Sequence, residues 1–174
     1  MNKNTTIDNI YKTIEDIKAE NEGHHGSKEQ LWIEEHLSDE SLRDIVPSLS
    51  IIALHILSSL ESDDKTGIEL SERLQVTRGG ITRAAKKLMQ YDLISSLQKQ
   101  GDRKKIYYHL LDSGKEIAIV HDKMHEQINQ RISQYFMEKY SENELTIVDK
   151  FIKDVYNFER NFSSMRDALF ESIH

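Results

Sequence analysis

Two histidines, His121 and His125, stand four residues apart in the stretch VHDKMHEQ. Residues with this spacing share one face of a helix, so the two imidazoles can bind one tetrahedral metal ion together. Both flank the apolar residues Val120 and Met124, which places them at the boundary of a buried face. Because the chain has eight histidines, such a pair also arises by chance, and the spacing alone is a weak motif.

Three further histidines lie where they could complete a metal site. His55 stands inside the apolar segment SIIALHILSSL, where a buried imidazole needs a polar partner. His24 and His25 lie beside Glu22, directly after the first expected helix. The chain has no cysteine, so the ligands must come from histidine, aspartate or glutamate. The competing interpretation is that His55 is a satisfied core histidine and that the others are solvated.

Basic residues are concentrated between positions 77 and 106. Eight lysines and arginines stand against two acidic residues there, a net charge of +6, whereas the whole chain carries −7. A basic strip on an acidic chain is typical of a protein that contacts nucleic-acid phosphates locally. The alternative is a surface for protein contacts, on which these charges are merely solvated.

The composition favours one mainly helical protein. Among its 174 residues are 7 Gly and 1 Pro, which leaves room for few loops. No apolar run is long enough to span a membrane and no signal-peptide core is present, so we expect a cytoplasmic protein without a membrane partner. The motifs of metalloproteases, serine hydrolases and nucleotide-binding enzymes are absent, so we do not expect an enzyme.

The basic segment has the pattern of a helix-turn-helix followed by a wing. A capping box at Thr66–Glu69 opens a short helix, and Thr77 can cap a second, longer one. After Asp92 the apolar period changes to two, which predicts a β-hairpin over residues 93–111 with a basic tip.

In a winged helix the second helix of the pair lies in the major groove, and we expect the hairpin tip at the minor groove. The candidate DNA-binding residues are Thr77, Arg78, Thr82, Arg83, Lys86, Arg103, Lys104 and Lys105. Gly79 and Gly80 weaken the first turn of that helix. They either permit close approach of the backbone to DNA or simply loosen the turn.

Amphipathic helices are predicted on both sides of the winged helix, over residues 5–22, 113–140 and from 141 onward with a break near 161–164. Their apolar faces cannot all close on one small winged helix, so they need a partner surface.

We therefore expect a mainly α fold with a small β-hairpin, forming a single domain over residues 1–174. Its winged-helix region is residues 49–112, and residues 1–48 and 113–174 are mainly dimerisation helices.

Three motifs resemble the MarR family of bacterial transcription regulators: LSERLQVTRGGITRAAKKL at Leu70–Leu88, GDRKK at Gly101–Lys105 and LLDSG at Leu110–Gly114. The resemblance covers roughly residues 49–158. It implies a homodimer that binds a pseudo-palindromic operator in double-stranded DNA.

Within this resemblance, Arg103 corresponds to a wing arginine that reaches the minor groove, and Asp102 to an aspartate that stabilises the wing. Two positions depart from the family pattern. Leu111 stands where threonine is usual, and Asp92 stands where glycine is common after the recognition helix. Neither departure removes a DNA contact, so we interpret both as structural variation.

The zinc-responsive branch of the family is similar at the histidines. The resemblance places His55, His121 and His125 on zinc-ligand positions and implies a carboxylate ligand in the loop after the first helix. That loop is longer here. The fourth ligand is then one of Glu22, His24 and His25.

The function expected from the resemblance is that of a dimeric, sequence-specific DNA-binding regulator, a repressor, with zinc as its cofactor. The alternative is a MarR-like repressor without a metal site, which a small organic ligand releases from DNA. The two differ in their response to chelators, which only the metal-dependent protein would show.

Overall fold

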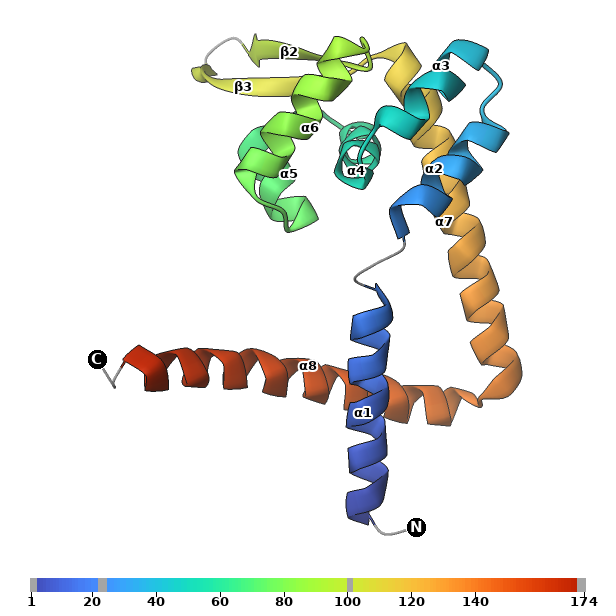
Figure 1. Cartoon of the computed structure of the whole chain (residues 1–174), viewed down its shortest axis with the longest axis vertical. Helices are drawn as coiled ribbons and strands as arrows, with labels where there is room; N and C mark the ends of the chain where they lie inside the picture. Colours follow the sequence, from blue (N-terminus) through green and yellow to red (C-terminus); the bar gives the residue numbers. More distant parts are fainter. Residues whose placement is uncertain (1–2, 22–24, 100–101, 172–174) are drawn as a thin grey trace. The chain divides into compact units, whose positions relative to one another are not determined.

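The computed structural model describes residues 3–21, 25–99 and 102–171 (Figure 1). The chain divides into two compact units, Met1–Glu126 and Gln127–His174. The described helices are α1 (Lys3–Asn21), α2 (His25–His36), α3 (Glu40–Ile45), the 3-10 helix η1 (Val46–Ser48), α4 (Ile51–Leu60), α5 (Gly67–Leu74), α6 (Arg78–Gln90), α7 (Asp112–Lys139) and α8 (Glu142–Glu171). The strands are β1 (Lys65–Thr66), β2 (Ile94–Lys99) and β3 (Asp102–Leu110).

Helix α4 forms the centre of the first unit. Its N-cap is Ser50, whose Oγ accepts a hydrogen bond from the Ala53 N–H at 3.2 Å. Six of its ten residues are buried, and α4 packs against α5, α6 and β3. A fully buried leucine or isoleucine contributes about 2 kcal/mol. The apolar sequence of α4 therefore makes it the core helix of the winged helix, on which α5, α6 and β3 pack.

The helix-turn-helix is confirmed. Thr66 and Glu69 make both hydrogen bonds of the predicted capping box at the start of α5. Thr77 caps α6 by accepting a hydrogen bond from the Gly80 N–H at 3.2 Å. The predicted inner face of α6 is buried, and its members are Ile81, Ala85 and Leu88. Figure 1 shows α5 and α6 beside each other, with α4 next to them.

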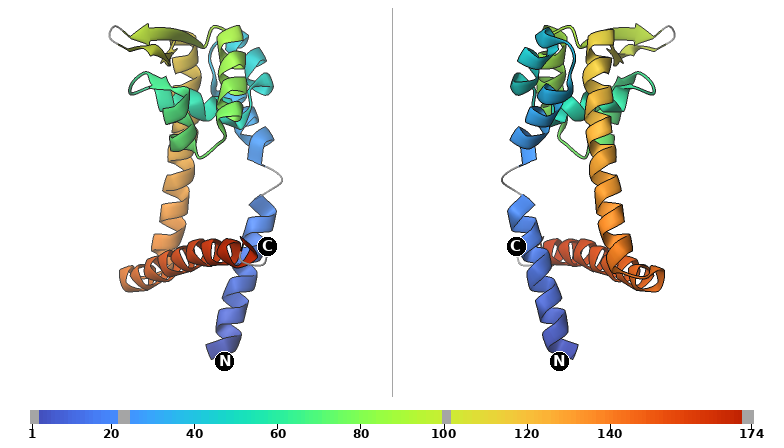
Figure 2. Two further views of the ribbon diagram at one scale, coloured as in Figure 1. Left: turned by 90° about the vertical axis from the view of Figure 1, so that its left-hand side faces the viewer. Right: turned by 90° about the vertical axis from the view of Figure 1, so that its right-hand side faces the viewer.

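The predicted hairpin is part of a three-stranded antiparallel sheet with the strand order β1-β3-β2. In both views of Figure 2 the β2–β3 hairpin extends away from the helices of this unit. Strand β1 was not predicted, because its two residues are too few to show a period. It pairs Lys65 with Tyr108 and Thr66 with Tyr107, so the start of α5 is attached to the wing.

The backbone conformation of Asp92 explains why glycine is common at this position, directly after the recognition helix. Its φ is 54°, a left-handed conformation that ends α6. The Leu93 N–H donates to Leu88 O at 3.0 Å and the Asp92 N–H to Met89 O at 3.2 Å. Aspartate tolerates this conformation better than most residues with a side chain. The departure from the family pattern is therefore structural.

Residues 25–48 form three short helices in succession, α2, α3 and η1. Ile33, Leu37 and Val46 from this segment are buried in the core of the first unit.

The second unit consists of the end of α7 and all of α8. The predicted capping box is present, since Ser141 Oγ accepts from the Glu144 N–H and the Ser141 N–H donates to the Glu144 carboxylate. The predicted break near residues 161–164 is wrong, because α8 continues to Glu171. Asparagine and serine are weak helix formers, but neither breaks a helix as proline does. Among the described residues, no helix is long and apolar enough to cross a membrane.

Candidate metal centre and nucleic-acid interface

Four side chains from three helices of the first unit converge on one point. Glu29 comes from α2, His55 from α4, and His121 and His125 from α7. One ligand atom of each lies within 4.8 Å of a ligand atom of every other. The three histidines predicted as metal ligands are therefore brought together.

His121 and His125 face each other through their Nε2 atoms, which are 3.1 Å apart. Two lone pairs at this distance repel unless one nitrogen carries a proton or a cation lies between them. The other ring nitrogen of His121, Nδ1, lies 2.8 Å from Ser58 Oγ and 3.2 Å from Asp122 Oδ1. A proton on Nδ1 satisfies these partners and leaves the Nε2 lone pair for the cluster.

His55 is half-buried and packs against the other two rings, with centroids 5.0 Å from His121 and 5.6 Å from His125. A satisfied core histidine needs a hydrogen-bond partner. Within the described part of the chain, no hydrogen bond reaches the His55 imidazole. The metal interpretation gives its nitrogen a partner, and the core interpretation does not.

Glu29 is a member of the cluster that the sequence analysis did not name. Its Oε2 atom is buried and has no hydrogen-bond partner among the described residues. A buried carboxylate oxygen is costly unless a proton donor or a cation satisfies it. The available signal was that Glu29 stands one turn after His25 in a segment that could be helical.

The structure does not describe the side chain of any of the three residues predicted as a fourth ligand. Glu22 and His24 lie outside the described residues. His25 begins α2, but the position of its side chain is not described.

Burial keeps two of the imidazoles neutral. It lowers the pKa of His55 below 6.5, although the Glu29 carboxylate acts in the opposite direction. Burial also lowers the pKa of His121 below 6.5, against the hydrogen bond with Asp122. A neutral imidazole is the form that binds metal ions. Both groups are therefore prepared to act as ligands at neutral pH.

The donor set fits zinc. Three imidazole nitrogens and one carboxylate oxygen are ligands that this ion accepts in a tetrahedral site. Bond lengths near 2.0 Å place neighbouring ligand atoms about 3.4 Å apart. The nitrogen pair at 3.1 Å is close to that value, and the widest separation allowed within the cluster, 4.8 Å, requires only a small movement of side chains.

The candidate nucleic-acid interface is the outer face of α6 together with the wing. Thr77, Arg78, Thr82, Arg83 and Lys86 are all exposed, as contact with DNA requires. Lys105 is also exposed at the wing. The other three wing residues lie in β3, but the structure does not describe their side chains; they are Asp102, Arg103 and Lys104.

The first turn of α6 bears on the role of its two glycines. A Cβ atom added to Gly79 would meet nothing within 4 Å, whereas one added to Gly80 would contact Thr77 and Ile52. Gly79 therefore leaves open space on the outer side of the helix, and Gly80 packs inward.

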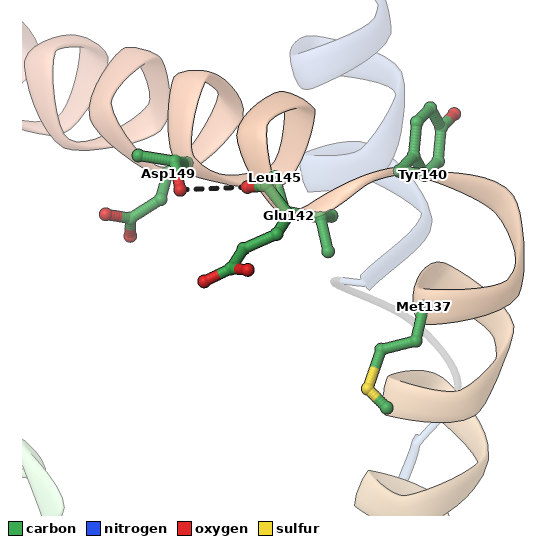
Figure 3. A pocket seen from close by; sticks show the side chains of 6 residues that line it. Met137, Tyr140, Glu142, Leu145 and Asp149 are labelled. Atoms are coloured by element: carbon green, nitrogen blue, oxygen red, sulfur yellow. Dashed lines mark hydrogen bonds between the residues drawn. The ribbon is translucent and has the colours of Figure 1, made fainter.

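A separate pocket of about 580 Å³ lies in the second unit, at the corner between α7 and α8. Figure 3 shows Met137 on α7 and Glu142, Leu145 and Asp149 on the first turns of α8. None of the described residues that line this pocket is a histidine, so their chemistry differs from that of the metal cluster.

Comparison with known proteins gives one family. The sequence profile of the MarR family matches residues 49–106. An uncharacterised HTH-type transcriptional regulator of Bacillus subtilis, YvnA, is 29% identical over 103 residues, which are 59% of this chain and 65% of that protein. The transcriptional regulator AdcR of Streptococcus pyogenes is 30% identical over 98 residues, 56% of this chain and 66% of AdcR. The matched segment thus spans about two thirds of the length of these relatives.

The fold is also similar to that of Lactococcus lactis ZitR, described as a zinc-responsive MarR family member. The crystal structure of that protein has a TM-score of 0.68 and 20% identity, and the match covers 87% of this chain and 97% of ZitR. A structure of ZitR in complex with DNA matches with a TM-score of 0.63 and 22% identity, over 90% of this chain and 97% of ZitR.

Proposed function

Because the chain is a winged helix-turn-helix protein of the MarR family of transcriptional regulators, we propose that it represses transcription by binding operator DNA as a homodimer, with zinc raising its affinity. Membership of this family confirms the expectation that the chain is not an enzyme. The observation that carries the zinc proposal is the convergence of Glu29, His55, His121 and His125, with a buried carboxylate oxygen that lacks a partner.

The DNA contacts in this proposal come from α6 and the wing. The start of α6 presents Arg78 and Thr82 to base edges, because N-terminal residues of a recognition helix enter the major groove. Arg103 enters the minor groove, Lys104 and Lys105 contact the backbone beside it, and Asp102 stabilises the wing. The ZitR structure with DNA supports this docking mode by similarity of fold alone.

The dimer is proposed to form through the terminal helices, in residues 1–48 and 113–174. Large apolar side chains are exposed along the end of α7 and along α8, and a monomer rarely exposes so many of them. They include Ile128, Ile132, Tyr135, Phe136, Ile147, Val148, Ile152, Tyr156 and Phe158. A second copy of the chain would cover them and complete one domain.

Zinc binding is proposed to act by joining α2, α4 and α7. Since α4 packs against α6, the metal favours one arrangement of the helices that support the recognition helix. Operator half-sites are about 34–36 Å apart, so one arrangement of a dimer fits them best. A ligand increases affinity for DNA by the difference in its own affinity for the two arrangements. Zinc is thus the corepressor.

Metal binding itself is tested by titrating zinc chloride into metal-free protein in competition with a fluorescent chelator. We expect one ion per chain. Glu29→Gln and His125→Ala should each weaken zinc binding by about 100-fold, because each removes one of four ligands.

The matched control is His36→Ala. The His36 ring stacks on Trp32 with centroids 3.7 Å apart, outside the cluster, so its removal should leave zinc affinity unchanged. Equal zinc affinity in the wild type and in both cluster variants would refute the metal centre.

A further inference from the structure

A cavity of about 340 Å³ lies in the first unit, between the start of α4 and one face of α6. It is distinct from the histidine cluster and shares no residue with it. Its walls are formed by Ser48, Ser50, Ile52, Gly80, Arg83, Ala84 and Lys87.

The cavity divides the basic residues of α6 into two rows. Arg78, Thr82 and Lys86 follow one another at intervals of four and are exposed. Arg83 and Lys87 form a second row, about 100° around the helix, and only this row lines the cavity. Arg83 was predicted as a DNA contact together with the first row, whereas Lys87 is one of the eight basic residues of the segment but not one of the predicted DNA contacts.

The polar groups of the cavity suit an anion. Two cationic side chains, Arg83 and Lys87, line it together with the hydroxyl group of Ser50. Ser50 Oγ accepts from the Ala53 N–H and keeps its own proton for a ligand, whereas Ser48 donates its proton to Ile45 O at 2.7 Å. Within the described part of the chain, no carboxylate forms an ion pair with either cation. An anion would therefore find positive charge that no acidic partner neutralises.

Lys87 is held in place rather than freely extended into solvent. It is half-buried, and its Nζ atom lies 4.7 Å from the centroid of the Tyr91 ring. Tyr91 Oη in turn lies 3.1 Å from Ser48 Oγ. Tyr91 thus contacts Lys87 through its ring and Ser48 through its hydroxyl group, which orders the lysine before a ligand binds.

We propose that this cavity binds a phosphate group of the DNA backbone, held by Arg83, Lys87 and the hydroxyl group of Ser50. The inference rests on the proposed DNA binding. It adds that different residues of α6 contact the bases and the phosphate groups. Arg78 and Thr82 read bases, whereas Arg83 and Lys87 fix the position of the helix on the duplex and carry no sequence information.

The test is fluorescence anisotropy of full-length protein, held at one zinc concentration, with two labelled duplexes of unrelated sequence over a series of salt concentrations. Lys87→Gln should lower affinity for both duplexes by the same factor. The slope of log affinity against log salt should become smaller by about 1, because one phosphate contact is lost. Arg83→Gln should act in the same way, with an unchanged preference between the duplexes.

The charge-matched control is Lys115→Gln, which removes an exposed lysine from α7, away from the cavity. It should leave the salt slope unchanged. Circular dichroism and thermal unfolding of each variant separate a lost contact from a lost fold.

Three results would overturn the inference. One is wild-type affinity and salt slope in both cavity variants. Another is a changed preference between the duplexes, which would make the two residues readers of sequence. The third is strong binding of inorganic phosphate to the wild type that Lys87→Gln abolishes while DNA affinity stays the same, which would assign the cavity to a free anion. Failure of the wild type to bind either duplex would instead refute the proposed DNA binding itself.

Discussion

At the scale of single residues, Glu29 supplies what the three imidazoles cannot, a negative charge. Zinc held by neutral ligands alone would place two positive charges in a largely buried site, and a carboxylate offsets one of them. In the proposed zinc site, the buried Oε2 of Glu29 would therefore be the charged ligand, and without a cation it lacks a hydrogen-bond partner among the described residues.

The histidines of the cluster could be predicted from sequence, and the glutamate could not. The spacing of His121 and His125 and the apolar surroundings of His55 mark them in the sequence itself. The place of Glu29 depends on where α2 lies against α4 and α7, which is a property of tertiary packing. Glu29 also stands in a polar stretch whose helical period is weak, so the local sequence pattern does not distinguish it from the other acidic residues nearby.

The pH dependence of zinc affinity follows from the lowered pKa values of His55 and His121, which burial causes. Protons compete with zinc for the same lone pairs. Because both pKa values lie below 6.5, protons displace zinc from these two imidazoles mainly below that pH, and affinity should fall more steeply there than at higher pH. Competitive chelator titrations at several pH values measure this. A decline that is no steeper below about pH 6.5 than above it would contradict the burial of these imidazoles.

At the scale of secondary-structure elements, replacing glycine by alanine should change the free energy of unfolding in opposite directions at Gly114 and at Gly79. A Cβ atom on Gly114 would lie 2.1 Å from Leu93 O, a backbone atom that cannot move easily. Gly114→Ala should therefore lower the free energy of unfolding by about 3 kcal/mol. Gly79→Ala meets no atom and should raise it by about 1 kcal/mol, because alanine favours a helix over glycine.

Urea denaturation of both variants measures the two changes. A small effect of Gly114→Ala would mean that the first turn of α7 does not pack on Leu93 as described. A loss of stability in Gly79→Ala would mean that the first turn of α6 is strained. If Gly79→Ala gains stability but loses DNA affinity, the glycine serves close approach to DNA; if it keeps affinity, the glycine only loosens the turn.

Elements with their own local signals were predicted well. The caps at Thr66, Thr77 and Ser141 fix the starts of α5, α6 and α8, because capping hydrogen bonds are made within a few residues. Strand β1 was not predicted, since it is defined by its pairing with β3 rather than by a pattern. The uninterrupted course of α8 also differs from the prediction, which gave too much weight to residues 161–164.

At the scale of the whole molecule, charge and apolar surface are allocated to different parts of the sequence. The net charge of +6 lies between residues 77 and 106, in the recognition helix and the wing. Most of the exposed large apolar residues lie along α7 and α8, after the basic segment, although Ile68 and Ile106 are exposed in the winged helix. Separate surfaces for DNA and for a second copy of the chain are what a dimeric repressor requires.

DNA affinity with and without zinc distinguishes a zinc corepressor from an organic effector. Duplexes selected by the protein itself from a random-sequence pool would be titrated with chelator-treated protein, then with the same protein after zinc is added. The account predicts at least about a tenfold gain in affinity with zinc, a typical coupling between two ligands. Glu29→Gln should show no such gain. Equal affinity with and without zinc, in protein shown to hold the ion, would contradict the account and favour an organic ligand as the effector.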